Sequence, residues 1–284
     1  MSEFILGTAT FGSVYGIANN GTQISNLEVK NIISVAQKNG IEEFDTAPSY
    51  GKAEKLLGKF LDINFQTKIS SKISQKDCIS VQSILDSIKK TLIDTKTDKL
   101  SNIYLHDPEP SNERNFRILR EGLREAKLMG FIESIGASVY SLNSLIKLKD
   151  FFPEMSVFQV PENICDRRLI NSEVIFKLFD TGNKFIVRSI FLQGLLLMPL
   201  KKIEMTSSFQ AVSQLTNFAK EMNTSNLDIC VAYARSISWA SGIIIGVASP
   251  KQLSEIMNSK FSLPNNWETL INTLPVDSLD PRSW

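Results

Sequence analysis

Short apolar runs alternate with segments of helical periodicity along the whole chain. Eight of these runs are rich in β-branched or aromatic residues and short enough to be strands, the length typical of elements buried in a sheet. Strands are therefore predicted over residues 4–8, 41–46, 67–72, 102–106, 132–138, 156–160, 184–189 and 242–247.

The segments between these runs repeat apolar residues at the spacing of one helix face. The first begins with a capping box formed by Ser25 and Glu28, and Gly40 ends it. Two further apolar stripes predict helices near 81–92 and 116–126, the second closed by Gly130. Helices with less distinct ends are predicted over 140–150, 168–180, 209–222, 226–238, 250–259 and 264–273.

Eight β–α alternations without a break in composition predict a single-domain (β/α)₈ TIM barrel over residues 1–284. The alternative is a doubly wound open sheet, which also alternates strands and helices. That fold would need a glycine-rich phosphate loop after its first strand. The sequence there, ATFGSVYG, lacks the G-x-G-x-x-G pattern, so the barrel is favoured.

Composition argues against several classes of partner. The formal net charge is +1, from 31 basic and 30 acidic residues, so no global field favours nucleic acid or a membrane surface. No segment approaches the roughly 20 apolar residues of a membrane span, and the N-terminus lacks the features of a signal peptide. Three distant cysteines, Cys78, Cys165 and Cys230, indicate free thiols in a reducing compartment. We therefore expect a cytoplasmic protein.

Four side chains suited to proton transfer fall at the predicted ends of neighbouring strands. Asp45 ends the second strand and Tyr50 lies in the loop after it, whereas Lys72 and His106 end the third and fourth strands. In a barrel these ends converge on one rim, where active sites form. Taken singly, each residue also has a structural explanation, since a histidine at a strand end is commonly a hydrogen-bonded core residue.

The four residue types suit the protonation of a carbonyl oxygen during reduction of its carbon. A phenol is a weak acid at neutral pH, and a neighbouring lysine ammonium lowers its pKa. An aspartate keeps that ammonium charged and aimed, and a histidine orients the carbonyl or assists proton transfer. His106 is the single histidine, so no site with two or three histidine ligands exists, and no metal is expected.

On these motifs the sequence resembles the aldo-keto reductases. The matching stretches are LGTATFG, FDTAPSYGKAEKLLG, the lysine of SSK, IYLHDPE, IGAS, VFQVPENICDRR, VRSIFLQGLL and IIIGVASPKQL, in the family's order over nearly the whole chain. The resemblance implies a barrel that binds a nicotinamide cofactor without a Rossmann motif. It also implies that Tyr50 is the general acid, that Asp45 and Lys72 tune it, and that His106 positions the substrate.

The resemblance further implies which residues contact the cofactor. Ser138 and Gln159 match residues that hold the nicotinamide carboxamide, the loop after the seventh strand wraps the pyrophosphate, and the segment 246–255 holds the adenosine. The expected contacts are Thr8, Ala9, Ser138, Gln159, Arg188, Ser189, Gln193, Leu195, Gly246, Ala248, Gln252 and Glu255.

Several positions depart from the family pattern. Val139 stands where the family usually has Asn, and Arg188 stands where an aromatic often stacks on the nicotinamide. Many members grip the 2′-phosphate of NADP with a Lys or Arg in the adenosine segment. The matching residues here carry no charge or differ in type: Gly246, Ala248, Gln252 and Ile256, with Lys251 the nearest cation. The cofactor is expected to be NADP(H) or NAD(H), and the preference stays open.

These observations predict an oxidoreductase that converts a small-molecule aldehyde or ketone to an alcohol. The chain is similar to short bacterial members associated with surface-sugar biosynthesis, which favours a sugar-derived carbonyl over a simple aromatic or aliphatic aldehyde. The alternative is a redox-sensing partner protein with little turnover, like the β subunits of potassium channels. That alternative predicts a large exposed apolar patch. A monomer or weak homo-oligomer is expected, without nucleic-acid or membrane partners.

Overall fold

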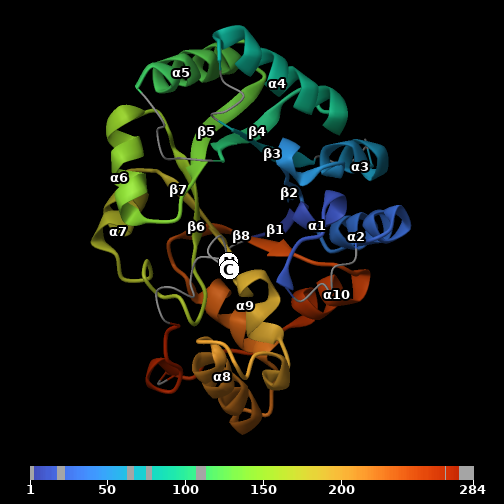
Figure 1. The fold of residues 1–284 in the computed structure, drawn as a ribbon, viewed down its shortest axis with the longest axis vertical. Helices are drawn as coiled ribbons and strands as arrows, with labels where there is room; N and C mark the ends of the chain where they lie inside the picture. Colours follow the sequence, from blue (N-terminus) through green and yellow to red (C-terminus); the bar gives the residue numbers. More distant parts are fainter. Residues whose placement is uncertain are drawn as a thin grey trace.

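The computed structural model describes residues 3–17, 23–62, 67–74, 79–106, 113–265 and 267–274. Within them, eight parallel strands close into one barrel in the order β1 to β8, and helices surround it (Figure 1). The predicted (β/α)₈ barrel is confirmed. The open doubly wound sheet is wrong, because β8 pairs with β1 from Glu3↔Gly242 to Gly7↔Gly246.

Every predicted strand is present, with small differences at the ends. The strands are β1 (Glu3–Gly7), β2 (Glu43–Asp45), β3 (Lys68–Ile73), β4 (Leu100–Leu105), β5 (Ile132–Ser138), β6 (Val157–Pro161), β7 (Lys184–Arg188) and β8 (Ala240–Gly246). β4 and β8 each begin two residues before their predicted starts. Pairing explains the extension, since Leu100 is opposite Ile132 and Ala240 is opposite Phe185.

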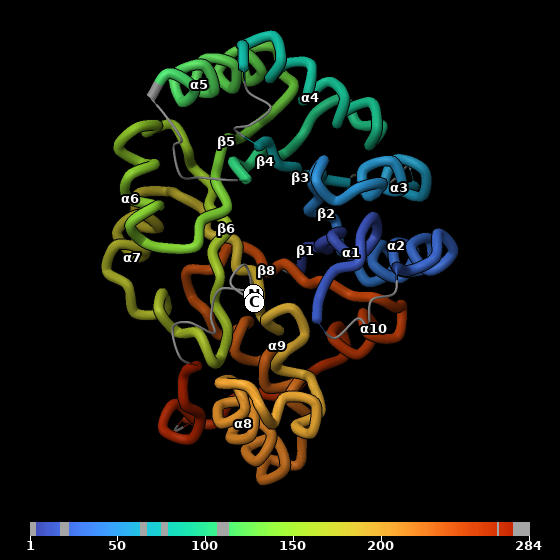
Figure 2. Tube along the Cα trace, in the orientation of Figure 1, coloured from blue at the N-terminus to red at the C-terminus, as the bar shows by residue number. Residues whose placement is uncertain are grey.

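The helices lie outside the strands, as the tube in Figure 2 also shows. They are α1 (Ala9–Gly12), α2 (Asn26–Lys38), α3 (Ala53–Phe60), α4 (Val81–Thr95), α5 (Glu113–Leu128), α6 (Leu142–Phe151), α7 (Glu173–Asp180), α8 (Phe209–Glu221), α9 (Asn226–Ser236) and α10 (Pro250–Asn258), with 3-10 helices η2 (Pro48–Tyr50), η4 (Leu192–Leu197), η5 (Leu200–Lys202) and η6 (Trp267–Thr269). The capping box that begins α2 is formed as predicted.

The helix predictions need correction in two respects. Helices α1 and α3 were not predicted, because no side-chain cap hydrogen bond marks either start: the residues before them are Thr8 and Lys52. Conversely, the helix predicted over 264–273 is wrong, since its described part contains only the short η6. The Leu274 N–H donates to the Cys165 carbonyl oxygen instead, which joins this segment to the loop after β6.

The apolar core has two parts. The larger lies between the strands and the surrounding helices, and it includes the buried free thiols of Cys165 and Cys230. Cys78 lies outside the described residues. The smaller core lies inside the barrel, where it is built from Ile5, Tyr104, Val157 and Ile186, with Ile244 against them. It forms the floor beneath the carboxyl ends of the strands.

Candidate active site

A cavity of about 740 Å³ opens at the carboxyl ends of the strands. This is the size of a site for a drug-sized ligand or cofactor. Asp45, Tyr50, Lys72 and His106 all line it, so the four side chains that the sequence placed at separate strand ends do come together. The barrel rather than the local sequence brings them to one place.

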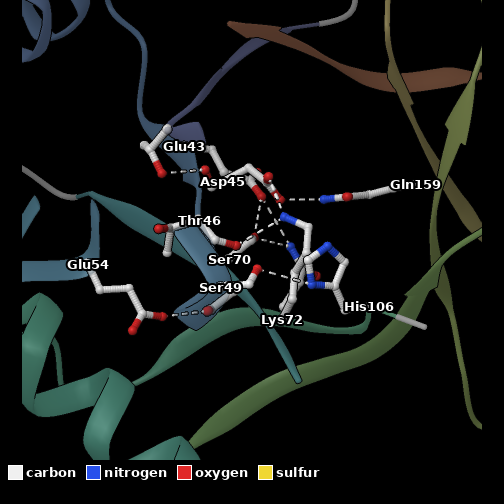
Figure 3. Close-up of polar contacts among 12 residues, drawn as sticks. Glu43, Asp45, Thr46, Ser49, Glu54, Ser70, Lys72, His106 and Gln159 are labelled. Carbon is white, nitrogen blue, oxygen red and sulfur yellow. Dashed lines mark hydrogen bonds and ion pairs between the residues drawn. The ribbon is translucent and has the colours of Figure 1, made fainter. Parts of the chain in front are cut away.

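Asp45 and Lys72 form a buried ion pair on neighbouring strands. The Lys72 ammonium donates to Asp45 Oδ2 at 2.5 Å and to the Thr46 carbonyl oxygen at 3.0 Å (Figure 3). Burial lowers the pKa of Lys72. The Asp45 carboxylate and the Tyr50 phenol together raise that pKa by more than burial lowers it, so the net shift is upward. Lys72 is therefore held as a cation inside the protein.

Tyr50 lies at the end of η2, directly above this pair. The Lys72 Nζ atom is 5.0 Å from the centre of the tyrosine ring, and the two side chains share a hydrogen bond. Burial raises the pKa of Tyr50 and is the largest influence on it, while Lys72 lowers it. The net shift is upward, not downward as the sequence analysis predicted, so the phenol holds its proton at neutral pH.

His106 follows the last residue of β4. Its backbone N–H donates to the Ile73 carbonyl oxygen at 3.0 Å, which continues the pairing of β3 with β4. Its ring meets the ring of Tyr50 edge to face, with 6.0 Å between centroids, and Nδ1 lies 3.4 Å from the Ser49 hydroxyl. The imidazole is thus oriented beside the phenol at the cavity wall.

Most of the residues expected to contact a cofactor also line this cavity. They are Thr8, Ala9, Ser138, Gln159, Arg188, Ser189, Gln193, Gly246, Ala248, Gln252 and Glu255. Leu195 differs, because its side chain is buried in the apolar core and does not line the cavity. The turn that carries it is nevertheless part of the wall, through Gln193 and Gly194.

Arg188 and Gln159 have partners that the sequence did not indicate. Arg188 donates through Nη2 to the Val139 carbonyl oxygen at 3.1 Å, and its guanidinium lies 4.1 Å from the centre of the Tyr140 ring. Its buried Nε has no hydrogen-bond partner among the described residues. Gln159 donates to Asp45 Oδ1, on the side of the carboxylate away from Lys72.

The segment after β7 has an unusual backbone. Ser189, Leu192, Gln193 and Gly194 all have positive φ, between 47° and 94°. A Cβ on Gly16 would lie 3.2 Å from the Gln193 carbonyl oxygen, so the loop after α1 passes close to this segment. The two loops meet at the cavity, of which both Gly16 and Gln193 are lining residues.

Several lining residues were missed by sequence analysis, among them Tyr15, Tyr140 and Lys202. Tyr15 follows the first strand and Tyr140 the fifth, so an aromatic soon after a strand end was an available signal. Lys202 is seven residues beyond the last residue matched in its loop, and only the turn at η5 brings it to the cavity.

Comparison with known proteins identifies the family. The model of the Aldo/keto reductase family matches residues 3–266. The chain belongs to this family. As an aldo-keto reductase it is an NAD(P)-dependent oxidoreductase that acts on carbonyl groups, and the predicted resemblance is confirmed.

Individual relatives of this aldo-keto reductase are distant. D-arabinose 1-dehydrogenase of Saccharomyces cerevisiae is 22% identical over 95% of this chain and 86% of its own length. A thermostable aldo-keto reductase in complex with the inhibitor epalrestat shares 21% identity and a TM-score of 0.75, covering 95% of this chain and 94% of that one. Glycerol dehydrogenase of Gluconobacter oxydans shares 17% identity and a TM-score of 0.71, covering 94% and 88%. At these identities the structures support the fold.

The cavity suits a dinucleotide. Its lining includes Arg188, the small residues Gly246 and Ala248, and Lys202 as a cation for a phosphate. No side chain would meet a Cβ added at Gly246, which leaves room there for a ligand. Across the described ranges, no helix is long and apolar enough to cross a membrane.

Proposed function

We propose that this aldo-keto reductase reduces an aldehyde or ketone to an alcohol, with Tyr50 as the proton donor. The observation that carries the proposal is the buried Lys72 ammonium, which pairs with Asp45 and touches the phenol at the cavity wall. A buried cation is costly unless it is paired. The pair therefore has a use beyond packing: it stabilises the charge that Tyr50 acquires.

The chemistry divides between the cofactor and the protein. When bound, a reduced nicotinamide supplies the hydride for the carbonyl carbon. Tyr50 gives its proton to the carbonyl oxygen, and the phenolate left behind is stabilised by Lys72. Asp45 keeps that ammonium in place, and His106 orients the carbonyl through its position against the ring of Tyr50.

We assign the cofactor's nicotinamide end to Ser138, Gln159 and Arg188, and its phosphates to the loop that carries Ser189, Gln193 and Lys202. Near the adenosine end, Lys251 pairs with Glu255 at 3.8 Å and is largely exposed, and Gln252 accepts from the Ala248 N–H at 2.7 Å. The adenosine segment therefore offers a 2′-phosphate one solvent-exposed lysine and no buried cation. We infer that NADH is used as well as NADPH.

For the substrate we propose a sugar-derived carbonyl. The yeast relative is a D-arabinose 1-dehydrogenase, which supports this class. The cavity also offers aromatic rings at Tyr15 and Tyr140 together with the imidazole of His106, which suits a molecule with both apolar faces and hydroxyls. A simple aromatic or aliphatic aldehyde is the competing class.

The test combines binding and turnover. NADH and NADPH are titrated against the protein by fluorescence, and the better cofactor is then used with a panel of aldoses, ketoses and simple aldehydes. Tyr50→Phe is expected to bind the cofactor normally but to lower kcat by about 10²–10⁴-fold, as loss of a general acid does. Wild-type turnover by Tyr50→Phe would refute its role. Cofactor binding without turnover on any carbonyl would favour a redox-sensing partner protein.

A further inference from the structure

Polar side chains continue from the active site down through the inside of the barrel. Residues two apart on a strand face the same side, so Glu43 on β2 lies below Asp45, and Ser70 on β3 lies below Lys72. Inward positions of such barrels are mostly branched apolar residues. We call the group below and beside the ion pair the polar column; it comprises Glu43, Ser70, Asn102 and Tyr104 below the pair and Gln159 beside Asp45.

The lower part of the polar column is anchored on the Glu43 carboxylate. The Ser70 hydroxyl donates to Glu43 Oε1 at 2.7 Å (Figure 3). The Asn102 amide donates to the same oxygen at 3.1 Å. The Asn102 amide also donates to the Ser70 hydroxyl oxygen at 2.8 Å. Glu43 and Asn102 are half-buried, whereas Ser70 is fully buried.

The upper part joins this anchor to the ion pair. The buried Tyr104 side chain hydrogen-bonds with both Ser70 and Gln159. Gln159 in turn donates to Asp45 Oδ1, while Asp45 Oδ2 accepts from Lys72 (Figure 3). Both oxygens of the Asp45 carboxylate are thereby fixed, one by Lys72 and the other by the polar column.

We propose that Glu43 is a positioning residue for the reaction: through Ser70, Tyr104 and Gln159 it orients the Asp45 carboxylate, and so the Lys72 ammonium beneath Tyr50. The inference rests on the proposed function, because it assigns a use to the same ion pair. A column that served only packing would not need to end on a carboxylate, whereas one that orients Asp45 needs a fixed acceptor at its base.

Charged groups around Glu43 agree with this arrangement. Burial raises the pKa of Glu43, its hydrogen bond from Ser70 lowers it, and the nearby Asp45 raises it again, with Lys68 and Asn102 lowering it. The net shift is upward. The Glu43 and Asp45 carboxyl groups therefore interact electrostatically, and a change in the charge of one alters the protonation of the other.

The test separates hydrogen bonding from charge and from packing. Glu43→Leu removes the acceptor, Glu43→Gln keeps an acceptor oxygen but removes the charge, and Tyr104→Phe cuts the column above an intact Glu43. Glu42→Leu is the matched control, since Glu42 directly precedes Glu43 but its side chain is half exposed and pairs with Lys68 at 3.8 Å. Thermal unfolding of each variant checks that it folds.

One readout does not need turnover. The alkaline absorbance titration of Tyr50 is isolated by subtracting the titration of the same protein carrying Tyr50→Phe. Asp45 raises the pKa of Tyr50 and Lys72 lowers it. If Asp45 is held less firmly, the midpoint should fall by about 0.5 pH unit or more in Glu43→Leu and Tyr104→Phe, a shift of the size found within one hydrogen-bonded network. Glu43→Gln should restore it, and Glu42→Leu should leave it unchanged.

The second readout is kinetic. Glu43→Leu and Tyr104→Phe should each lower kcat about 3- to 30-fold with KM nearly unchanged, and the double variant should be no slower than either single one. Effects that multiply in the double variant, or a Glu43→Gln protein as impaired as Glu43→Leu, would overturn the proposal. If the wild type reduced no carbonyl, the proposed function would fail, and the Tyr50 titration would still decide the role of Glu43.

Discussion

The carbonyl oxygen of Tyr50 occupies the space beside Gly12 where any side chain would project. A Cβ added at Gly12 would lie only 1.7 Å from that oxygen and 2.6 Å from the Lys52 backbone nitrogen. Helix α1 therefore supports the backbone of η2, and with it the phenol of Tyr50. Gly12, the last residue of the motif LGTATFG, thus helps to position the side chain of Tyr50, which is 38 residues later in the chain.

We predict that Gly12→Ala lowers kcat of the folded protein in addition to its stability, since the clash displaces the Tyr50 loop relative to Lys72. A loss of about 10²-fold is expected, as for misplacement of a catalytic group by about 1 Å. Gly58→Ala is the matched control, because its Cβ would meet the Asp94 carbonyl oxygen at 2.3 Å, far from the cavity. Both variants should unfold at lower temperature. Equal kcat for the folded fraction of both would contradict the supporting role of Gly12.

Asp45→Asn should destabilise the protein by about 3–5 kcal/mol, since it leaves the buried Lys72 ammonium without its counter-charge. Urea unfolding measures this loss. The exposed Lys68–Glu42 pair, with side chains about half accessible to solvent, provides the comparison: Glu42→Gln should cost less than about 1 kcal/mol. If Asp45→Asn were as mild as Glu42→Gln, Lys72 would not depend on Asp45 for its charge.

Glu162 should make stability depend on pH. Burial raises its pKa to about 8, although the Tyr233 hydroxyl donates to it at 2.6 Å and the Leu169 N–H at 3.0 Å. The folded pKa lies above the unfolded one, so its stabilising contribution is complete below about pH 4.5. Between about pH 4.5 and 8 the unfolded chain binds fewer protons than the folded one, and stability falls as pH rises.

Glu162→Gln should remove that slope, which for one group is about 1.4 kcal/mol per pH unit. Urea unfolding at intervals from pH 5 to 8 measures it in both proteins. The amide keeps an oxygen that accepts from Tyr233, so the variant should fold. Parallel curves for the two proteins would show that Glu162 is ionised in the folded state.

Lys202→Ala should weaken cofactor binding, because Lys202 lines the cavity where we place the phosphates. A charge-assisted hydrogen bond of about 1.5–3 kcal/mol corresponds to a Kd about 10- to 100-fold higher. Lys201→Ala removes the same charge from the neighbouring exposed residue, which does not line the cavity. Fluorescence titration should show the larger effect at low salt. Equal effects of the two variants would remove Lys202 from the site.

Local sequence determined the order and type of most elements. The capping box at Ser25 predicted the start of α2, and apolar stripes predicted α4 and α5. These signals are readable from sequence because capping and amphipathic spacing involve residues only a few positions apart. The four proton-transfer residues were also recoverable, since Asp45, Lys72 and His106 mark strand ends and a closed barrel gathers such ends at one rim. Helix α3 escaped prediction because it has no capping side chain.

Tertiary structure decided what these residues experience. The upward shift of the pKa of Tyr50 results from burial and from the charges of Lys72, Asp45 and Arg188 together. These residues lie on different strands, so no local stretch of sequence predicts the shift. The position of Lys202, the inward burial of Leu195 and the polar column below Asp45 depend on how distant segments pack and on the register between strands. Hydrogen bonds and Coulomb interactions act through space, so they follow the fold rather than the order of the sequence.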